Sequence, residues 1–206
     1  MKSSFHQLTE LPNESNQRAL LFLTLGSKYL NLVHNVLGKT IESGNTHMVV
    51  SDGNFSWEDY YQKTKWSDFF IIEPVLFCLY HGFELTIKGL ILLVSDEAVE
   101  SIHSISKLYS NLMALEKVPN DIKDIIGKYV DPNSGHLVSN FLIENGKDID
   151  GLYESLRYPA DKKFQNLNSY FQLHYKEGEA IKEYEMILQD ILNLQTAGTK
   201  LYRSHS

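Results

Sequence analysis

The sequence lacks the motifs of several common enzyme and metal-binding folds. Its single cysteine, Cys78, cannot form an intramolecular disulfide and cannot belong to a Cys-x-x-Cys metal pair. There is also no Gly-rich phosphate loop and no Gly-x-Ser-x-Gly nucleophile motif. These absences leave kinase and serine-hydrolase functions without support.

Positive charge is also scarce. Nineteen Lys and Arg face 26 Asp and Glu, and the net charge of -7 argues against a protein that coats nucleic acid non-specifically. No basic end with an apolar run precedes Phe5, so we expect no secretion signal. The longest uncharged run of the central apolar stretch, Pro74–Phe83, is far shorter than the roughly 20 residues that cross a bilayer. We therefore expect a cytoplasmic protein that makes no membrane contact.

The most apolar stretch of the chain is Phe77–Ser95, and it carries three ionisable residues. On a helix His81, Glu84 and Lys88 project from one narrow stripe, while apolar residues cover the rest of the circumference. This pattern predicts a central helix surrounded by other helices. The three side chains could form the polar floor of a pocket, or they could be a structural network in which buried charges pair with one another.

The remaining sequence predicts an all-α helical bundle with one small insertion. An Asp-Gly turn signal among β-branched residues predicts a hairpin or loop insertion around 41–56, and alternation predicts an extended segment at 171–175. We expect a single domain over 1–206 with its core at 16–198. The predicted outer helices cover residues 16–37, ending at Gly38, then 96–115, 121–130, 134–144 and 179–196, ending before Gly198.

An aromatic-dense stretch, residues 57–70, precedes the central helix. Its aromatic side chains could stack on nucleic-acid bases or anchor a partner protein. Alternatively, they could form a lid that packs on the bundle, and the interleaved acidic residues favour this interpretation.

Three motifs in order resemble HEPN domains, the helical domains found with nucleotidyltransferases and in prokaryotic conflict systems. Residues 81–85 with Lys88 resemble the central-helix signature of that family. Residues 103–105 resemble the histidine-led start of its next helix, and residues 157–159 resemble the Arg-Tyr-Pro stretch before its last helix. The resemblance spans 16–198 and implies an up-and-down bundle that is often a homodimer.

The sequence departs from the HEPN members that cleave RNA without metal. Those members carry an Arg followed by a His after four to six residues, whereas none of the three arginines here, Arg18, Arg157 and Arg203, has such a histidine. The resemblance therefore implies the fold and a non-nuclease role more than it implies a ribonuclease.

The candidate site residues combine the central helix with the Arg-Tyr-Pro stretch. Arg suits bidentate phosphate recognition, and histidine exchanges protons near neutral pH. His81 and His103 are the candidate catalytic residues should the protein be an enzyme. The predicted ligand-binding residues are His81, Glu84, Lys88, Arg157, Tyr158, Lys162 and Lys163. His81 and Glu84 have the i, i+3 spacing of carboxylate–histidine metal sites, but a di-metal bundle also needs a second such pair and further glutamates from facing helices. His103, His136 and His174 occur without that context, so we expect no metal, and we also expect no cofactor.

Three functions are compatible with these patterns. The first is a non-catalytic HEPN-like module, within a toxin–antitoxin or phage-defence system, that binds a nucleotide or RNA. The second is a divergent metal-independent endoribonuclease toxin that uses His81 or His103 as acid or base. The third is a protein-interaction scaffold that docks a partner protein through residues 57–70.

Overall fold

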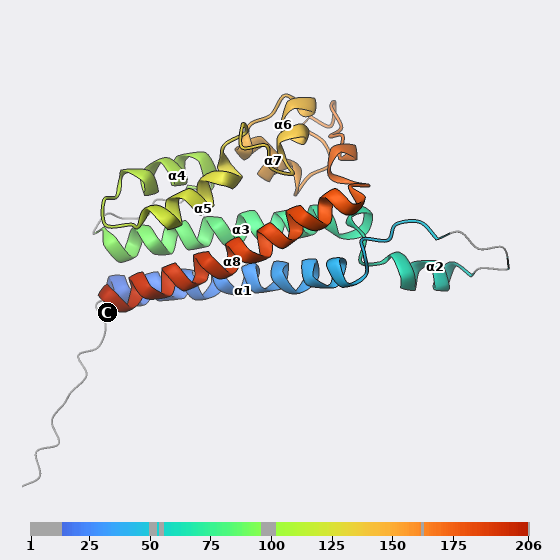
Figure 1. Ribbon diagram of the computed structural model, residues 1–206. Helices are drawn as coiled ribbons and strands as arrows, with labels where there is room; N and C mark the ends of the chain where they lie inside the picture. Colours follow the sequence, from blue (N-terminus) through green and yellow to red (C-terminus); the bar gives the residue numbers. More distant parts are fainter. Residues whose placement is uncertain (1–13, 50–52, 54–55, 96–101, 162, 206) are drawn as a thin grey trace, which may run out of the picture.

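The computed structural model describes residues 14–49, 53, 56–95, 102–161 and 163–205, and this part of the chain is all-α with no strand. Its eight α-helices pack as a bundle, which confirms the predicted fold class at this level (Figure 1). In order they are α1 (Glu14–Glu42), α2 (Trp57–Thr64), α3 (Asp68–Val94), α4 (Ile105–Ala114), α5 (Asn120–Val130), α6 (Ser139–Asn145), α7 (Ile149–Ser155) and α8 (Glu177–His205), with a 3-10 turn, η1 (Phe171–Leu173), before α8.

Three long helices, α1, α3 and α8, lie side by side (Figure 1). Asn45, just after α1, donates its side-chain amide to Asp68 at the start of α3, and at the other end Ser15 Oγ donates to the Leu92 carbonyl. These two contacts make α1 and α3 antiparallel. The backbone N–H of Lys176 also donates to Asp68, so α8 starts beside the start of α3. Helices α4 and α5 cover α3 and α8, and α7 contacts α4.

Helix α3 is the core helix that the sequence predicts. It is long and apolar enough to cross a membrane, yet 78% of its most apolar window is buried inside the bundle, as in the core helix of a soluble protein. The helix starts at Asp68, earlier than predicted, so Pro74 lies in its second turn and the aromatic pair Phe69-Phe70 belongs to its first turn.

Two predicted helix ends are wrong, because the chain stays helical through both glycines. Helix α1 continues past Gly38 to Glu42 and ends where Gly44 and Asn45 adopt positive φ angles of 68° and 51°. Helix α8 likewise continues past Gly198 to His205. In both helices buried residues beyond the glycine, Thr40 in α1 and Leu201 in α8, keep the packing surface continuous.

The predicted hairpin around 41–56 is wrong for the residues that the structure describes there. Its first two residues belong to α1, and residues 46–49 have no strand partner. Asp52, half of the predicted turn, lies outside the described residues. The described part of the loop is held by the Asn45 side chain, which also accepts from the backbone N–H of Asp68, and these side-chain contacts replace a strand ladder.

Four shorter segments also differ from the predictions. Residues 134–138 form a turn before α6 rather than helix, and Phe171–Leu173 is a 3-10 turn rather than an extended segment. Helix α7 is not among the helices that the sequence predicts, although the Asp148 side chain caps it by accepting from the Gly151 N–H. In the predicted helix 96–115, residues 96–101 lie outside the described residues, and residues 102–104 are wrongly predicted, because Ser104 is the N-cap and α4 starts at Ile105.

Helix α2 projects from one end of the bundle (Figure 1). Trp57 is 73% exposed, and Tyr61 is also exposed. In the described part of the chain, the aromatic ring that stacks on Trp57 is that of Tyr60, in the same helix. The predicted lid is therefore wrong for Trp57, whereas Tyr61 of α2 meets Phe70 edge to face at 5.9 Å, and Phe70 at the start of α3 packs on the core. Docking of a partner through this stretch stays a prediction.

Candidate functional site

The candidate site is centred on Glu84, a carboxylate that is only 2% exposed in the middle of α3. Lys88, one helical turn later, donates to Glu84 Oε1 at 2.8 Å. The Nδ1 atom of His103 lies 2.9 Å from the same oxygen, and the Tyr153 hydroxyl donates to Oε2 at 2.9 Å. One buried charge thus joins α3, the residues before α4, and α7.

The hydrogen bonds fix which ring nitrogen of His81 carries a proton. Its Nδ1 lies 2.8 Å from the Tyr153 hydroxyl oxygen, whose one hydrogen already goes to Glu84. His81 Nδ1 must therefore donate. His103 Nδ1 must donate as well, because its partner is a carboxylate. In the neutral form of either ring the lone pair is therefore on Nε2, the nitrogen available for a ligand or a proton.

The electrostatics of the network keep Glu84 ionised. Burial alone would raise the pKa of Glu84, but hydrogen bonds from His81, Lys88, Tyr153 and His103 outweigh burial and lower the pKa to about 2. For Tyr153, burial and the adjacent Glu84 carboxylate raise the pKa, so the hydroxyl stays protonated and remains a donor. The carboxylate can therefore orient both histidines throughout the neutral pH range.

Aromatic rings enclose His81 on α3. Phe77, one turn earlier, stacks on the imidazole with centroids 5.8 Å apart, and the edge of Tyr29 from α1 approaches it at 4.6 Å. The imidazole side chain remains 27% exposed. The ring is thus held in one orientation while part of it reaches the surface.

Arg157 joins the site through Tyr153. Its guanidinium carbon lies 5.1 Å from the centroid of the Tyr153 ring and 5.8 Å from that of Tyr158. Both aromatic residues and the arginine are at or just beyond the end of α7. No ion pair of Arg157 occurs within the described ranges, so its planar donor group is available to an anion.

Helix α7 also positions His103. Asp150 accepts from the backbone N–H of Ile105 at 2.5 Å and from the Ser104 hydroxyl at 2.8 Å, and so caps the start of α4. His103, the residue before Ser104, is thereby held against Glu84, although its side chain is 71% exposed. His103 therefore lies just before the N-cap of α4, Ser104.

The structure brings together some of the predicted site residues and separates others. Lys88 and His103 contact Glu84, and Tyr153 links Glu84 to His81. Arg157 lies over the Tyr153 ring, with Tyr158 beside it. Glu84 and Lys88 are buried, so they can orient other groups but cannot contact a large ligand.

The predicted residue Lys163 does not join this group. It lines a different hollow of about 450 Å³, together with Lys147 and Asp161, and Arg157 does not line it. Lys162 lies outside the described residues.

Sequence reasoning missed two residues of the site, Tyr153 and Asp150. Tyr153 precedes Arg157 by four residues, a spacing that would bring the two side chains together on a helical turn. The spacing of Tyr153 and Arg157 indicates a contact only where residues 149–155 are predicted to be helical, and they were not. Nothing in the sequence pairs Asp150 with the start of α4, because 45 residues separate it from Ile105.

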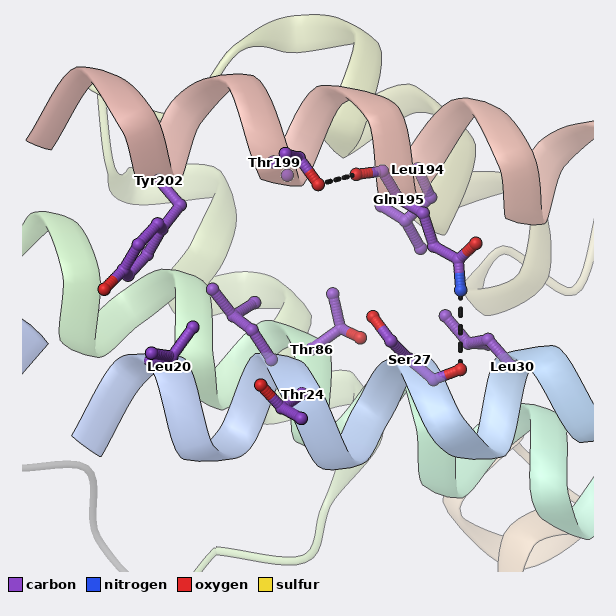
Figure 2. Close-up of a pocket in the computed structure, with 11 residues that line it drawn as sticks. Leu20, Thr24, Ser27, Leu30, Thr86, Leu194, Gln195, Thr199 and Tyr202 are labelled. Carbon is purple, nitrogen blue, oxygen red and sulfur yellow. Dashed lines mark hydrogen bonds between the residues drawn. The ribbon is translucent and has the colours of Figure 1, made fainter. Parts of the chain in front are cut away.

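A second concavity lies between α1 and α8 (Figure 2). It encloses about 190 Å³, and the Gln195 side chain spans it by donating to the Ser27 carbonyl at 3.4 Å. Its lining consists of leucines, a tyrosine and small or uncharged polar residues, with no charged side chain. This groove is therefore poorly suited to phosphate and is not part of the Glu84 site.

No group of three or more His, Cys, Asp or Glu with metal-binding geometry occurs in the part of the chain that the structure describes.

Comparisons with known proteins give no further identification. No family model, no curated protein and no solved structure matches the chain.

Proposed function

We propose that this protein is a HEPN-like module that binds the phosphate of a nucleotide or of RNA at the exposed edge of the Glu84 network. The observation that supports it most is that a single buried carboxylate orients both His81 and His103 through their Nδ1 atoms. Their Nε2 atoms are left for a ligand, next to an arginine that has no ion-pair partner among the described residues.

The chemistry of these groups suits a phosphate. Arg157 can donate two parallel hydrogen bonds to phosphate oxygens, and Tyr153 holds its guanidinium plane in place. A histidine that gains a second proton donates from Nε2 and adds positive charge beside the anion. Phe77 and Tyr29 are half-buried near His81 and offer aromatic surface to a base.

Glu84 and Lys88 have positioning roles in this proposal. Lys88 neutralises Glu84, so the network adds no net negative charge that would repel a phosphate. Homodimer formation, cytoplasmic location and a role in a toxin–antitoxin or phage-defence pair stay predictions.

Binding of a fluorescently labelled single-stranded RNA, followed by anisotropy at low salt with competition by AMP, tests the proposal. Arg157→Ala should weaken binding roughly tenfold or more, because it removes a charge-assisted pair of hydrogen bonds. Arg203→Ala, in the last turn of α8, is the matched control and should bind as the wild type does. No binding by the wild type, or equal losses in both variants, would refute the assignment.

One observation favours a second function, metal-independent cleavage of RNA. Two histidines with fixed tautomers share one carboxylate. One Nε2 could take the proton of a ribose 2′-hydroxyl as it attacks the phosphorus, and the protonated Nε2 of the other could return a proton to the departing 5′-oxygen. RNA fragments produced in EDTA by the wild type, and lost in both His81→Ala and His103→Ala, would establish it. Intact RNA after prolonged incubation at high protein concentration would refute cleavage, and RNA binding would then be the proposed function that remains.

A further inference from the structure

A second polar site lies where the turn before α6 meets the first turns of α8, on residues that the phosphate proposal does not use. Here a cavity of about 150 Å³ is lined by His136 and Asn140 on one side and by Lys176, Glu179 and Glu183 on the other. A nucleotide is too large for this volume. It suits a molecule of a few non-hydrogen atoms, or about five waters at roughly 30 Å³ each.

His136 lines this cavity with both ring nitrogens unsatisfied. Its side chain is only 5% exposed, and neither Nδ1 nor Nε2 has a hydrogen-bond partner among the described residues. The ring is held in place by Tyr129, which it meets edge to face at 4.5 Å. Buried polar atoms are nearly always paired in folded proteins, so two unpaired nitrogens beside a cavity point to an occupant.

Glu183 supplies a second unsatisfied acceptor to the same cavity. Its Oε2 atom is buried without a hydrogen-bond partner and lies 3.8 Å from His136 Nε2. The two atoms are too far apart to bond each other, but a single donor atom can lie within hydrogen-bond distance of both.

The charges around the cavity select the sign of the occupant. Burial lowers the pKa of His136 to about 4, so its ring is neutral at neutral pH and keeps one lone pair. Burial raises the pKa of Glu183, which a hydrogen bond from the Leu137 backbone opposes, so a cation beside this carboxylate would favour its ionised form. With Glu183 ionised, Glu179 and Glu183 outnumber the one lining cation, Lys176. A cationic occupant with several N–H donors fits this set of groups better than an anion does.

We propose that this cavity binds a small primary ammonium compound whose N–H groups donate to Glu183 Oε2 and to the unprotonated ring nitrogen of His136. The compound is small because the cavity is small, and it is distinct from the ligand of the Glu84 network. The protein would then bind two ligands of opposite charge, a cation in this cavity and a phosphate at the Glu84 network.

Titration of histidine-labelled protein with ethylammonium chloride, followed by the ring signals of His136 in NMR spectra, tests the proposal. The wild type should show a saturable change in these signals. Tetramethylammonium chloride, which has no N–H group, and sodium acetate should not produce it. No saturable change with ethylammonium, or the same change with tetramethylammonium, would mean that water alone fills the cavity and would overturn the proposal.

Two variants on α8 sharpen the test. Glu183→Gln keeps the side-chain shape but removes the charge, and it should weaken ethylammonium binding roughly tenfold or more. Glu185→Gln makes the same chemical change on an exposed position that does not line the cavity, and it should bind as the wild type does. Equal affinity in the two variants would contradict the assignment of Glu183 as the acceptor.

Discussion

The Tyr153 hydroxyl lies 2.9 Å from Glu84 Oε2 and 2.8 Å from His81 Nδ1, so one tyrosine of α7 both satisfies the buried carboxylate of α3 and orients the imidazole beside it. Arg157 stacks on the same tyrosine ring. Tyr153 is therefore the residue that links the buried carboxylate Glu84 to the more exposed side chains His81 and Arg157.

Replacing Tyr153 by Phe should release His81 while leaving the fold intact. The variant loses the hydroxyl but keeps the ring that packs on Phe77 and Arg157. We expect a loss of about 1–3 kcal/mol in the free energy of unfolding, because Glu84 Oε2 loses a buried partner. Long-range ¹H–¹⁵N spectra should show a weaker preference of His81 for the Nδ1–H form, because only Glu84 Oε2, 3.5 Å from Nδ1, then remains as its acceptor. A single Nδ1–H form in the variant would show that Tyr153 does not set the tautomer.

Replacing Lys88 by Ala should destabilise the protein strongly, because it leaves the buried Glu84 without its cation. Breaking a buried ion pair costs about 3–5 kcal/mol. Lys39 pairs with Glu42 at a similar spacing on the exposed surface of α1, so Lys39→Ala is the control and should cost about 0–1 kcal/mol. Urea unfolding of both variants measures the difference. Equal midpoints would show that the Glu84 network contributes little to stability.

The stability of the protein should fall in acid through Glu84. Its pKa is about 2 in the folded protein against 4.5 for the free side chain, so the ionised form is favoured by folding. This contribution is present above about pH 4.5 and disappears as the pH falls toward 2, a loss of about 3 kcal/mol. Urea midpoints between pH 5 and pH 2.5 test it, with Glu84→Gln as the variant that lacks this titration. Parallel pH curves for wild type and variant would contradict the assignment.

Two glycines of α1 should respond in opposite directions to alanine. A Cβ at Gly26 would lie 3.1 Å from the Gly82 carbonyl oxygen and 3.2 Å from the Thr86 nitrogen of α3, so Gly26→Ala should force the helices apart and cost about 1–3 kcal/mol. A Cβ at Gly38 meets nothing within 4 Å, so Gly38→Ala should stabilise α1 by about 0.5–1 kcal/mol. Thermal unfolding checks both. A stabilising Gly26→Ala would mean that α1 and α3 are not in close contact there.

The long helices were predictable because their apolar residues recur with the helical period. The spacing of His81, Glu84 and Lys88 was enough to predict one polar stripe on a buried helix, and Glu84 and Lys88 are indeed buried and paired. The helix ends were not predictable from glycine alone. Gly38 and Gly198 stay helical because packing continues beyond them, whereas the positive φ angles that end α1 occur at Gly44 and Asn45.

The rest of the site was hidden because it depends on contacts distant in sequence. Tyr153 lies 69 residues from Glu84, and Asp150 lies 45 residues from Ile105, so no local pattern links them. The short helix α7, which carries both residues, has too few residues to show a helical period. Local spacing therefore located the centre of the site, and only the folded chain showed its partners.

The most direct test of the account is a long-range ¹H–¹⁵N spectrum of the histidine rings during a titration with a short single-stranded RNA. We expect the Nε2 signals of His81 and His103 to shift saturably and their Nδ1 signals to keep the Nδ1–H form, whereas the signals of His205 in the last turn of α8 should not change. Arg157→Ala should weaken the response. Unchanged signals of His81 and His103 at saturating RNA, or equal shifts at His205, would contradict a phosphate site at the Glu84 network.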